Sequence, residues 1–381
     1  MLEELSTESV SYPLGGASRA IVRDLLLHGP RSRAELAERL RLSPGSLTRL
    51  TKPLLDAGLV KEGVAVVSGQ GRPSTPLEVV ASSGHFIGVK LTGDEAYAVL
   101  IDLHAQMLAE KSVRLERRSP EAVCDLVTEL AAELSDGRLI ASMGVTFGGH
   151  SPDHATAFAP YLGWNDVPLA AMLTRATGLV CVLDNDVVAF AESQHWFGAG
   201  RAHDRFALIT IGAGIGYALV LHDRILRSQE VDIGVFGHYI IDRAGPYCPS
   251  GHRGCAAAYL TSDAVAATAS VALRRPVSHD EVWTLAERGD PVCRRIADES
   301  GLALGRLLGA VADMSMTTNI ILSGEGVRLA AVAAEALWTG ISECRPDWAS
   351  PVALEVQEST FFEWARGAGV MAMQISVVGT D

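Results

Sequence analysis

Apolar residues in the first sixty positions recur at the three- and four-residue spacing of a helix face. They predict three short helices within residues 17–60. Ser32, followed three positions later by Glu35, predicts a capping box at the start of the second helix. Ser43 and Pro44 predict the start of the third, because serine caps helices and proline suits the first helical position. The segment is therefore typical of a small helical domain.

The third predicted helix carries leucines on one face and polar side chains on the other. Leu47, Leu50 and Leu54 share the inner face, and Pro53 is expected to kink the helix or end its regular part. Two short helices joined by a tight turn, the second with a basic outer face, suit the major groove of DNA. The side chains of this segment that are expected to contact DNA are Arg33, Ser43, Ser46, Thr48, Arg49 and Lys52.

Valines alternate with other residues in KEGVAVVSGQGRP, which follows the third helix, and this pattern predicts a β-hairpin wing. Arg72, between glycine and proline on an extended segment, is suited to enter a minor groove. Residues 74–81 are expected to form a linker. The alternative is a helical protein–protein module with a solvated charged face, but the order of three helices, wing and GRP favours DNA binding.

From His85 onward, buried strands alternate with amphipathic helices, which predicts an α/β protein. Several of these strands end in glycine-rich or acidic loops, where ligands usually bind in such folds. About 300 residues exceed one compact core, so two lobes are expected.

The composition is that of a globular protein. With 48% hydrophobic and 20% charged residues among 381, most of the chain is not expected to be disordered. No apolar run approaches the length of a membrane span, and the acidic first ten residues do not resemble a secretory signal. Six scattered cysteines do not form a disulfide framework. These features predict a cytoplasmic protein.

The net charge of −13 conceals an asymmetry. Residues 17–75 hold 10 basic and 5 acidic side chains, whereas residues 76–381 hold 22 basic and 37 acidic ones. A small basic unit therefore precedes a large acidic one, and only the first is expected to bind the phosphate backbone of DNA.

Two loops of the acidic part have residues that could carry chemistry. The backbone N–H groups around Gly212, Gly214 and Gly216 could cradle a phosphate, although most such turns are structural and no clear helix follows to complete a dinucleotide site. Asp184–Asp186 stand between a strand and a helix, where a carboxylate can act as a general base toward a hydroxyl or cap the helix. The pattern supports both alternatives at each loop.

A third segment, GHYIIDRAGPYCPSGHRGC, holds candidate metal ligands. His238, Cys248 and Cys255 offer the imidazole and thiolates of a structural zinc site, which usually takes four ligands. Ser250 stands where a CxC pair would place another thiol, and serine is a poor zinc ligand, so His252 or a water could be the fourth. The alternative is that both cysteines are ordinary turn residues.

Together these motifs resemble the ROK family, and in particular its xylose and N-acetylglucosamine repressor group. The matching segments span essentially the whole chain: SRAELAERLRLSPGSLTRL, GRP, GVKLTGDEAYAVLIDL, YLGWNDVPL, DNDVVAFAE, IGAGIG, GVFGH and CPSGHRGC. The resemblance implies a tail at 1–16, a winged helix-turn-helix domain at 17–73 and, after the linker at 74–81, a two-lobed actin/hexokinase-like domain at 82–381. That last domain would bind a sugar and form oligomers.

The resemblance also implies roles for individual residues. It carries the catalytic-base position onto Asp186, makes His238 a bridge between zinc and sugar, and makes Gly212–Gly216 the phosphate loop. The residues expected to contact the effector are Lys90, Gly148, Gly149, Asn185, Asp186 and His238.

Four positions depart from the kinases of the family. Lys90 stands where they carry the phosphate-loop aspartate, and a positive charge cannot help to hold magnesium. Val235, Ala257 and Tyr161 replace two glutamates and an asparagine of the sugar pocket, and each lost charged hydrogen bond costs ~1.5–3 kcal/mol. No enzymatic activity is expected, because phosphoryl transfer depends on positioned metal and phosphate.

The sequence therefore predicts a transcriptional regulator, and specifically a repressor, that binds double-stranded operator DNA as a homodimer or homotetramer. Its effector would be a sugar, an amino sugar or a sugar phosphate, and Lys90 with the glycine loop would favour an anionic ligand. The implied cofactor is structural Zn²⁺, and no membrane partner is expected. The alternatives are a regulator with a vestigial sugar site, controlled by a protein partner, and a sugar kinase fused to a DNA-binding domain.

Overall fold

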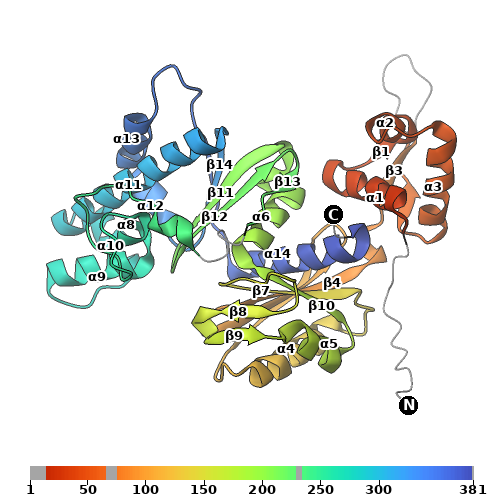
Figure 1. The fold of residues 1–381 in the computed structure, drawn as a ribbon, viewed down its shortest axis with the longest axis horizontal. Coiled ribbons are helices and arrows are strands. Elements are labelled where there is room, and N and C mark those ends of the chain that lie inside the picture. The colour runs from red at the N-terminus through yellow and green to blue at the C-terminus, as the bar shows by residue number, and fades with distance from the viewer. Residues whose placement is uncertain (1–13, 66–74, 229–233, 380–381) are drawn as a thin grey trace. The chain divides into compact units, whose positions relative to one another are not determined.

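The computed structural model describes residues 14–65, 75–228 and 234–379, which form two compact units (Figure 1). Unit 1 comprises Met1–Arg201 and Phe361–Asp381, and unit 2 comprises Ala202–Thr360. Both units combine sheets with helices, so the predicted α/β class and two-lobed organisation are confirmed. Within the described residues, no helix is both long and apolar enough to cross a membrane.

Unit 1 begins with the three predicted helices and a small sheet. The helices are α1 (Gly16–His28), α2 (Arg33–Arg39) and α3 (Pro44–Asp56). The strands, in sheet order, are β1 (Arg31–Ser32), β3 (Pro76–Val79) and β2 (Val60–Glu62). This is a winged helix, as the hydrophobic pattern predicts.

Both predicted helix caps are confirmed. The Ser32 hydroxyl accepts a hydrogen bond from the Glu35 N–H at 3.2 Å, and the Glu35 carboxylate accepts one from the Ser32 N–H at 2.8 Å. The Ser43 hydroxyl accepts the Ser46 N–H at 3.1 Å. These bonds satisfy amide donors that have no partner inside the helix, and they fix where α2 and α3 begin.

The third helix is longer than Pro53 suggests. It continues to Asp56, because Pro53 lies on the exposed side and its ring removes only one backbone donor there.

Part of the expected linker is a strand. Residues 76–79 form β3, in which Val79 pairs with Val60 of β2, and Leu77 and Val79 are buried. These apolar side chains complete the core of the winged helix, which is why the chain stays ordered in a segment rich in turn residues. Val66 and Val67 of the expected wing, together with Arg72, lie outside the described residues.

A mixed sheet with the order β10-β7-β4-β5-β6 forms the rest of unit 1 (Figure 1). Strands β4, β7 and β10 run parallel, and β5 and β6 are antiparallel additions. The strand bounds are β4 (His85–Leu91), β5 (Glu95–Asp102), β6 (Met107–Arg114), β7 (Ser142–Phe147) and β10 (Val180–Asn185), with a separate hairpin of β8 (Ala157–Ala159) and β9 (Trp164–Val167). The helix bounds are α4 (Pro120–Ser135), α5 (Leu169–Thr177), α6 (Asp186–Phe197) and α14 (Phe361–Met373).

Two glycines allow α14 to lie directly against this sheet. A Cβ atom on Gly88 of β4 would lie 2.0 Å from the carbonyl oxygen of Ala365, and one on Gly144 of β7 would lie 2.0 Å from that of Ala368. Only glycine permits this approach. Val89, the next residue along β4, faces α4 on the opposite side of the sheet. Helices therefore cover both faces of the sheet.

The winged helix and this lobe share one core within unit 1. Ile21 of α1 belongs to the same buried cluster as Val370 of α14. Beyond α6, the Arg201 guanidinium donates hydrogen bonds to the carbonyl oxygens of Leu27, at 2.7 Å, and Leu26, at 3.1 Å. These are terminal carbonyls of α1 that have no partner inside the helix, so Arg201 acts as a C-terminal cap from a distant part of the chain.

Unit 2 contains a five-stranded sheet with the order β13-β12-β11-β14-β15, packed against helices. Its strands are β11 (Arg205–Ile211), β12 (Ile215–Leu221), β13 (Arg224–Ile225), β14 (Asn319–Ser323) and β15 (Ala353–Val356). Its helices are α8 (Ala256–Leu260), α9 (Ser262–Leu273), α10 (His279–Glu287), α11 (Pro291–Ser315), α12 (Arg328–Val332) and α13 (Ala334–Cys344). The predicted glycine turn joins β11 to β12, and the predicted metal segment precedes α8.

Candidate functional sites

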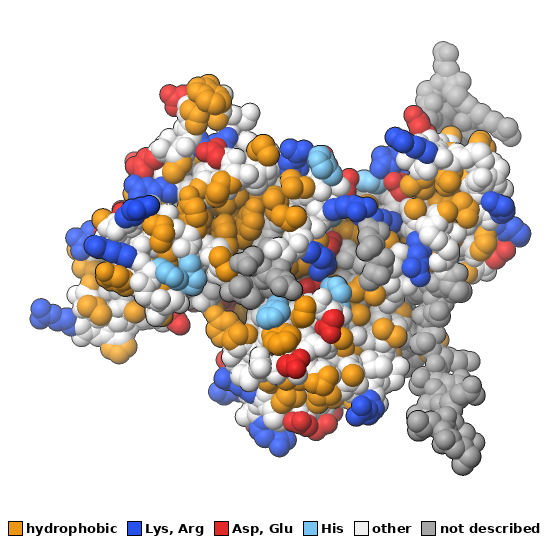
Figure 2. Space-filling view, viewed as in Figure 1, with side chains coloured by type: hydrophobic (Ala, Val, Ile, Leu, Met, Phe, Trp, Pro, Cys, Tyr) orange, Lys and Arg blue, Asp and Glu red, His pale blue; other side chains and the backbone are white. Residues whose placement is uncertain are grey.

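The outer face of α3 is exposed and its leucine face is buried. Thr48, Arg49 and Lys52 are exposed, whereas Leu47 and Leu54 are buried. Figure 2 shows Lys and Arg side chains on the surface of the winged-helix segment. This helix therefore presents the hydrogen-bond donors and positive charge that recognition of base edges and phosphates requires.

Contacts inside the domain distinguish the predicted DNA-binding side chains. The hydroxyls that are engaged within α3 and its cap are those of Ser43, Ser46 and Thr48. Arg33 pairs with Glu62 of β2 at 2.8 Å, and Lys52 pairs with Asp56 at 3.2 Å. Arg49 has no hydrogen bond or ion pair to any residue that the structure describes. Its guanidinium is therefore free to contact a base edge.

A buried ion pair lies at the centre of the expected effector site in unit 1. The Lys90 ammonium, on β4, contacts the carboxylate of Asp186 at the start of α6. The two side chains are 6% and 11% exposed. The same ammonium lies 5.6 Å from the centre of the Trp364 ring, within the range of a cation–π interaction. The carboxylate at the catalytic-base position is thus already paired with a cation.

Asn185 holds the neighbouring loop and the start of α6. Its side-chain oxygen accepts the N–H groups of Val187 and Val188 at 2.8 and 3.1 Å, and its amide nitrogen donates to the Gly149 carbonyl at 2.7 Å. The helix-capping alternative is therefore confirmed for Asn185. A Cβ atom on Gly148 would lie 3.8 Å from the Asp186 carboxylate, so both predicted glycines line the same site.

Asp184 lies deeper than its two neighbours. It is buried, its Oδ2 is 3.7 Å from Nδ1 of His154, and its Oδ1 accepts the N–H of Asn185. It therefore supports the loop instead of presenting a base. Five of the six expected effector residues, all except His238, belong to unit 1. Lys90 and Asp186 form the ion pair, and Gly148, Gly149 and Asn185 lie beside it.

The glycine turn of unit 2 faces a carboxylate of its own chain. Glu325 follows β14, and its Oε2 atom lies 3.4 Å from the Ala213 amide nitrogen. A Cβ atom on Gly212 would lie 2.5 Å from the same carboxylate oxygen. The Gly212 N–H donates to the Gly214 carbonyl at 3.0 Å. Two of the amides that would cradle a phosphate therefore have other partners, and one of these partners is a carboxylate. A strand follows the turn, so it is not a dinucleotide site.

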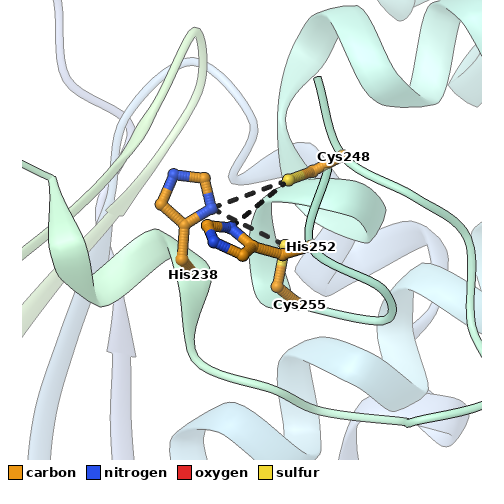
Figure 3. A group of neighbouring side chains, drawn as sticks. All are labelled: His238, Cys248, His252 and Cys255. Carbon is orange, nitrogen blue, oxygen red and sulfur yellow. Dashed lines mark hydrogen bonds between the residues drawn. The ribbon is translucent and has the colours of Figure 1, made fainter. Parts of the chain in front are cut away.

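Four side chains converge in the predicted metal segment, as Figure 3 shows. His238, Cys248, His252 and Cys255 place their ligand atoms within 4.8 Å of one another. The His238 Nδ1 atom lies 3.7 Å from the Cys248 sulfur and 3.8 Å from the Cys255 sulfur, and the His252 Nδ1 atom lies 3.7 Å from the Cys248 sulfur. The three predicted ligands are brought together, and His252 joins them.

These separations fit a tetrahedral zinc ion. With Zn–S bonds of about 2.3 Å and Zn–N bonds of about 2.0–2.1 Å, tetrahedral angles give S···N separations of about 3.6 Å. The observed values of 3.7 and 3.8 Å agree closely. Imidazole and thiolate are also the donors that zinc prefers. The donor set and its geometry therefore suit zinc without rearrangement of the chain.

Local interactions change the acidity of these groups. Desolvation, together with the electrostatic effect of the neighbouring His252, lowers the pKa of His238 and so favours the neutral form that binds a metal. Desolvation raises the pKa of the Cys255 thiol. Desolvation also opposes ionisation of Cys248, but backbone N–H groups of His252 and Ser250 donate to its sulfur, and its pKa is lowered overall. Donors that favour the thiolate also favour metal binding, because the thiolate is the form of cysteine that binds a metal.

Three contributors were not predicted from the sequence. Glu325 lies in SGEG, where an acid between two glycines after a strand was the available signal. Trp364 and Arg201 carried no signal, because each acts on a residue far away in the chain.

Residues 86–368 match the ROK family, and residues 17–61 match winged helix-turn-helix DNA-binding domains. The chain is 25% identical, over 324 residues, to the DNA-binding transcriptional dual regulator NagC of Escherichia coli K12, covering 81% of this chain and 80% of that protein. It is 33% identical to a glucokinase of Thermotoga maritima over 184 residues, 47% of this chain and 58% of the relative.

Among solved structures, the chain resembles a ROK family transcriptional regulator that is a homologue of the E. coli MLC protein. The TM-score is 0.79 at 23% identity, over 95% of this chain and 96% of that one. The fold is therefore shared over both the winged helix and the two lobes. Since the family match covers most of the chain and joins a winged helix-turn-helix domain at its N-terminal side, this protein belongs to the ROK family.

Proposed function

We propose that the protein is a sequence-specific DNA-binding transcriptional repressor whose ROK domain binds a sugar-derived effector without phosphorylating it. The observation that carries the proposal is the winged helix, in which α3 is capped, is buried on its leucine face and presents Arg49, unpaired among the described residues, on its outer face. The similarity to a DNA-binding regulator across four-fifths of both chains supports it.

One helix connects the effector site to the DNA-binding domain within unit 1. Helix α6 begins at Asp186 and is followed by Arg201, which caps α1 through Leu26 and Leu27. A ligand that binds Asn185 or Asp186 therefore acts on the helix whose far end holds α1. The ligand shifts DNA affinity only if it binds one arrangement of this connection better than the other.

Phosphoryl transfer is disfavoured at two points. The carboxylate at the catalytic-base position is paired with Lys90, so it is not free to take a proton from a hydroxyl. Glu325 faces the glycine turn and would repel the phosphates of a nucleotide. Both features support a binding domain over a kinase.

The ion pair also revises the expected ligand. Because Asp186 neutralises Lys90, the pair offers hydrogen-bonding groups but no net charge. A neutral sugar or an amino sugar therefore suits the site better than the anionic ligand that Lys90 alone would favour. If the Lys90→Asp variant bound sugar phosphates and neutral sugars as the wild type does, Lys90 would have no part in this selection.

The metal segment is proposed to hold a structural zinc ion through His238, Cys248 and Cys255. When bound, zinc would fix the loop before α8 and orient the His238 ring, leaving its Nε2 atom for a sugar hydroxyl. Zinc analysis of the purified protein tests this proposal directly, and a content near zero would refute it.

A single recognition helix reads one half-site of a palindromic operator. We therefore propose that the protein acts as a homodimer or homotetramer on double-stranded DNA. Sedimentation with and without an operator fragment measures the stoichiometry.

Genomic mapping of binding sites would identify the operator. The Arg49→Ala variant then tests whether Arg49 of α3 contacts a base. We expect the variant to lose about 1–3 kcal/mol on the operator and much less on unrelated DNA. Arg295→Ala, which removes an exposed arginine of unit 2, is the matched control and should bind as the wild type does. An equal loss of binding free energy on both DNAs would show that Arg49 contacts a phosphate and not a base.

A panel of sugars, amino sugars and sugar phosphates tests the effector site by thermal shift. A stabilising sugar should also release the operator. If no compound of the panel shifts the melting temperature, the result would favour a regulator with a vestigial sugar site, controlled by a protein partner. ATP turnover that depends on sugar and magnesium would favour a kinase.

A further inference from the structure

The metal segment lacks one thiolate of the usual donor set for a cysteine-rich site. Ser250 stands at the CxC position of CPSGHRGC, and its side chain is exposed. A serine hydroxyl is not among the ordinary ligands of zinc. With His238, Cys248 and Cys255 alone, a structural site would be one ligand short.

His252 reaches this open position from the same turn. Its Nδ1 atom lies 3.7 Å from the Cys248 sulfur, the same separation as that between His238 Nδ1 and this sulfur. The two imidazole rings are 4.5 Å apart and inclined at 61°, so they do not stack face to face. Figure 3 shows both Nδ1 atoms directed toward the sulfur atoms.

The backbone of the turn fixes His252 relative to Cys248. The Cys248 N–H donates to the His252 carbonyl at 2.9 Å, and the Gly251 N–H donates to the Cys248 carbonyl at 2.9 Å. Tyr247 and Arg253 form a bridge just outside these bonds. The turn that places the first thiolate therefore also places the second imidazole, although the His252 side chain is exposed.

We propose that His252 is the fourth zinc ligand and replaces the thiolate that Ser250 cannot supply. This inference rests on the zinc site proposed above. The resulting Cys₂His₂ site differs in charge from one with three thiolates: two thiolates balance the charge of Zn²⁺, whereas three leave one net negative charge. The exposed His252 is also the side of the site that a chelator reaches first.

The test is a ligand exchange in the full-length protein. Zinc content and the rate of zinc transfer to a coloured chelator are measured for the wild type, His252→Ala, Ser250→Ala and the double variant His252→Ala/Ser250→Cys. We expect His252→Ala to weaken zinc binding by roughly 100-fold or more, since even an outer-shell partner is worth about 10–100-fold. Ser250→Ala should match the wild type, and the double variant should recover zinc because a thiolate returns at the CxC position.

Cobalt substitution gives a second readout of the ligand set. Thiolate-to-cobalt charge-transfer absorbance should be about one and a half times as intense in the double variant as in the wild type, because three thiolates replace two. If His252→Ala retained zinc as the wild type does, the inference would be overturned. The site would then have His238, Cys248 and Cys255 as its protein ligands. A wild-type protein without zinc would overturn both proposals, so the two failures are distinguishable. Loss of zinc in Ser250→Ala would show that the serine is the ligand.

Discussion

Removal of the Lys90 charge should strongly destabilise unit 1, because Lys90 belongs to a buried ion pair. In Lys90→Met the side chain keeps much of its volume, but the Asp186 carboxylate stays buried without its cation. Breaking a buried ion pair by removing one partner costs about 3–5 kcal/mol. The lost contact with the Trp364 ring at 5.6 Å adds up to about 2 kcal/mol. We therefore expect a loss of about 3–7 kcal/mol in the free energy of unfolding.

A double-mutant cycle separates the contribution of the ion pair to the free energy of unfolding from the contribution of side-chain packing. Asp186→Asn alone leaves a buried ammonium without its carboxylate, and it should cost several kcal/mol for the same reason. The variant Lys90→Met/Asp186→Asn buries no charge, and replacing both partners by neutral groups is often close to neutral in stability. The double variant should therefore be more stable than either single one.

Urea unfolding followed by tryptophan fluorescence measures these free energies, and hydrogen exchange of β4 and the first turn of α6 locates the change. The reasoning would be refuted by a Lys90→Met variant within about 1 kcal/mol of the wild type. A double variant whose cost equals the sum of the two single costs would also refute it, because additivity means that the groups do not interact.

Three further predictions concern the packing of unit 1. Gly144→Ala would place a Cβ atom 2.0 Å from the Ala368 carbonyl oxygen and should cost about 3 kcal/mol or more in thermal unfolding, whereas Gly45→Ala, with open space around it, should not destabilise the fold. Arg201→Met should cost about 1.5–3 kcal/mol and increase hydrogen exchange at the end of α1, because two carbonyls lose a charged donor; unchanged exchange would contradict the capping role. Burial raises the pKa of Cys181 to about 11, so the neutral thiol is favoured in the folded state, and this contribution to stability should disappear as the pH rises from about 9 through 11. Cys181→Ala should show a smaller decline over the same range, and parallel declines would contradict the assignment.

The winged helix could be predicted in detail because its signals are local. The capping box joins residues three positions apart, Ser32 and Glu35, and the leucine face of α3 repeats within one helix. The exception is β3, whose order depends on pairing with another segment. Its turn-rich composition indicates a linker, but Leu77 and Val79 find a core only when the chain returns to β2. Burial that depends on a distant partner cannot be seen in the pattern of one segment.

The ion pair shows the same limit at the candidate site. The sequence identified Lys90 and Asp186 separately, as a departure and as a matching position, but they are 96 positions apart. Their contact depends on the order β10-β7-β4, which places the end of β4 two strands away from the start of α6. Considered alone, Lys90 suggested an anionic ligand; considered with its partner, it suggests a neutral one. Net charge in a site is therefore a property of the folded pair and not of either residue.

The metal segment contrasts with the ion pair because its geometry is local again. All four candidate ligands lie within 238–255, and the turn that holds three of them, 248–255, closes through backbone bonds between near neighbours. Ligand spacing could therefore be predicted from the sequence, and only the identity of the fourth ligand required the structure. A serine at 250 removes a thiolate, and the histidine two positions later supplies an imidazole to the same centre. Such an exchange preserves the number of ligands while it removes one negative charge, so charge, more than geometry, is what the substitution changes at this site.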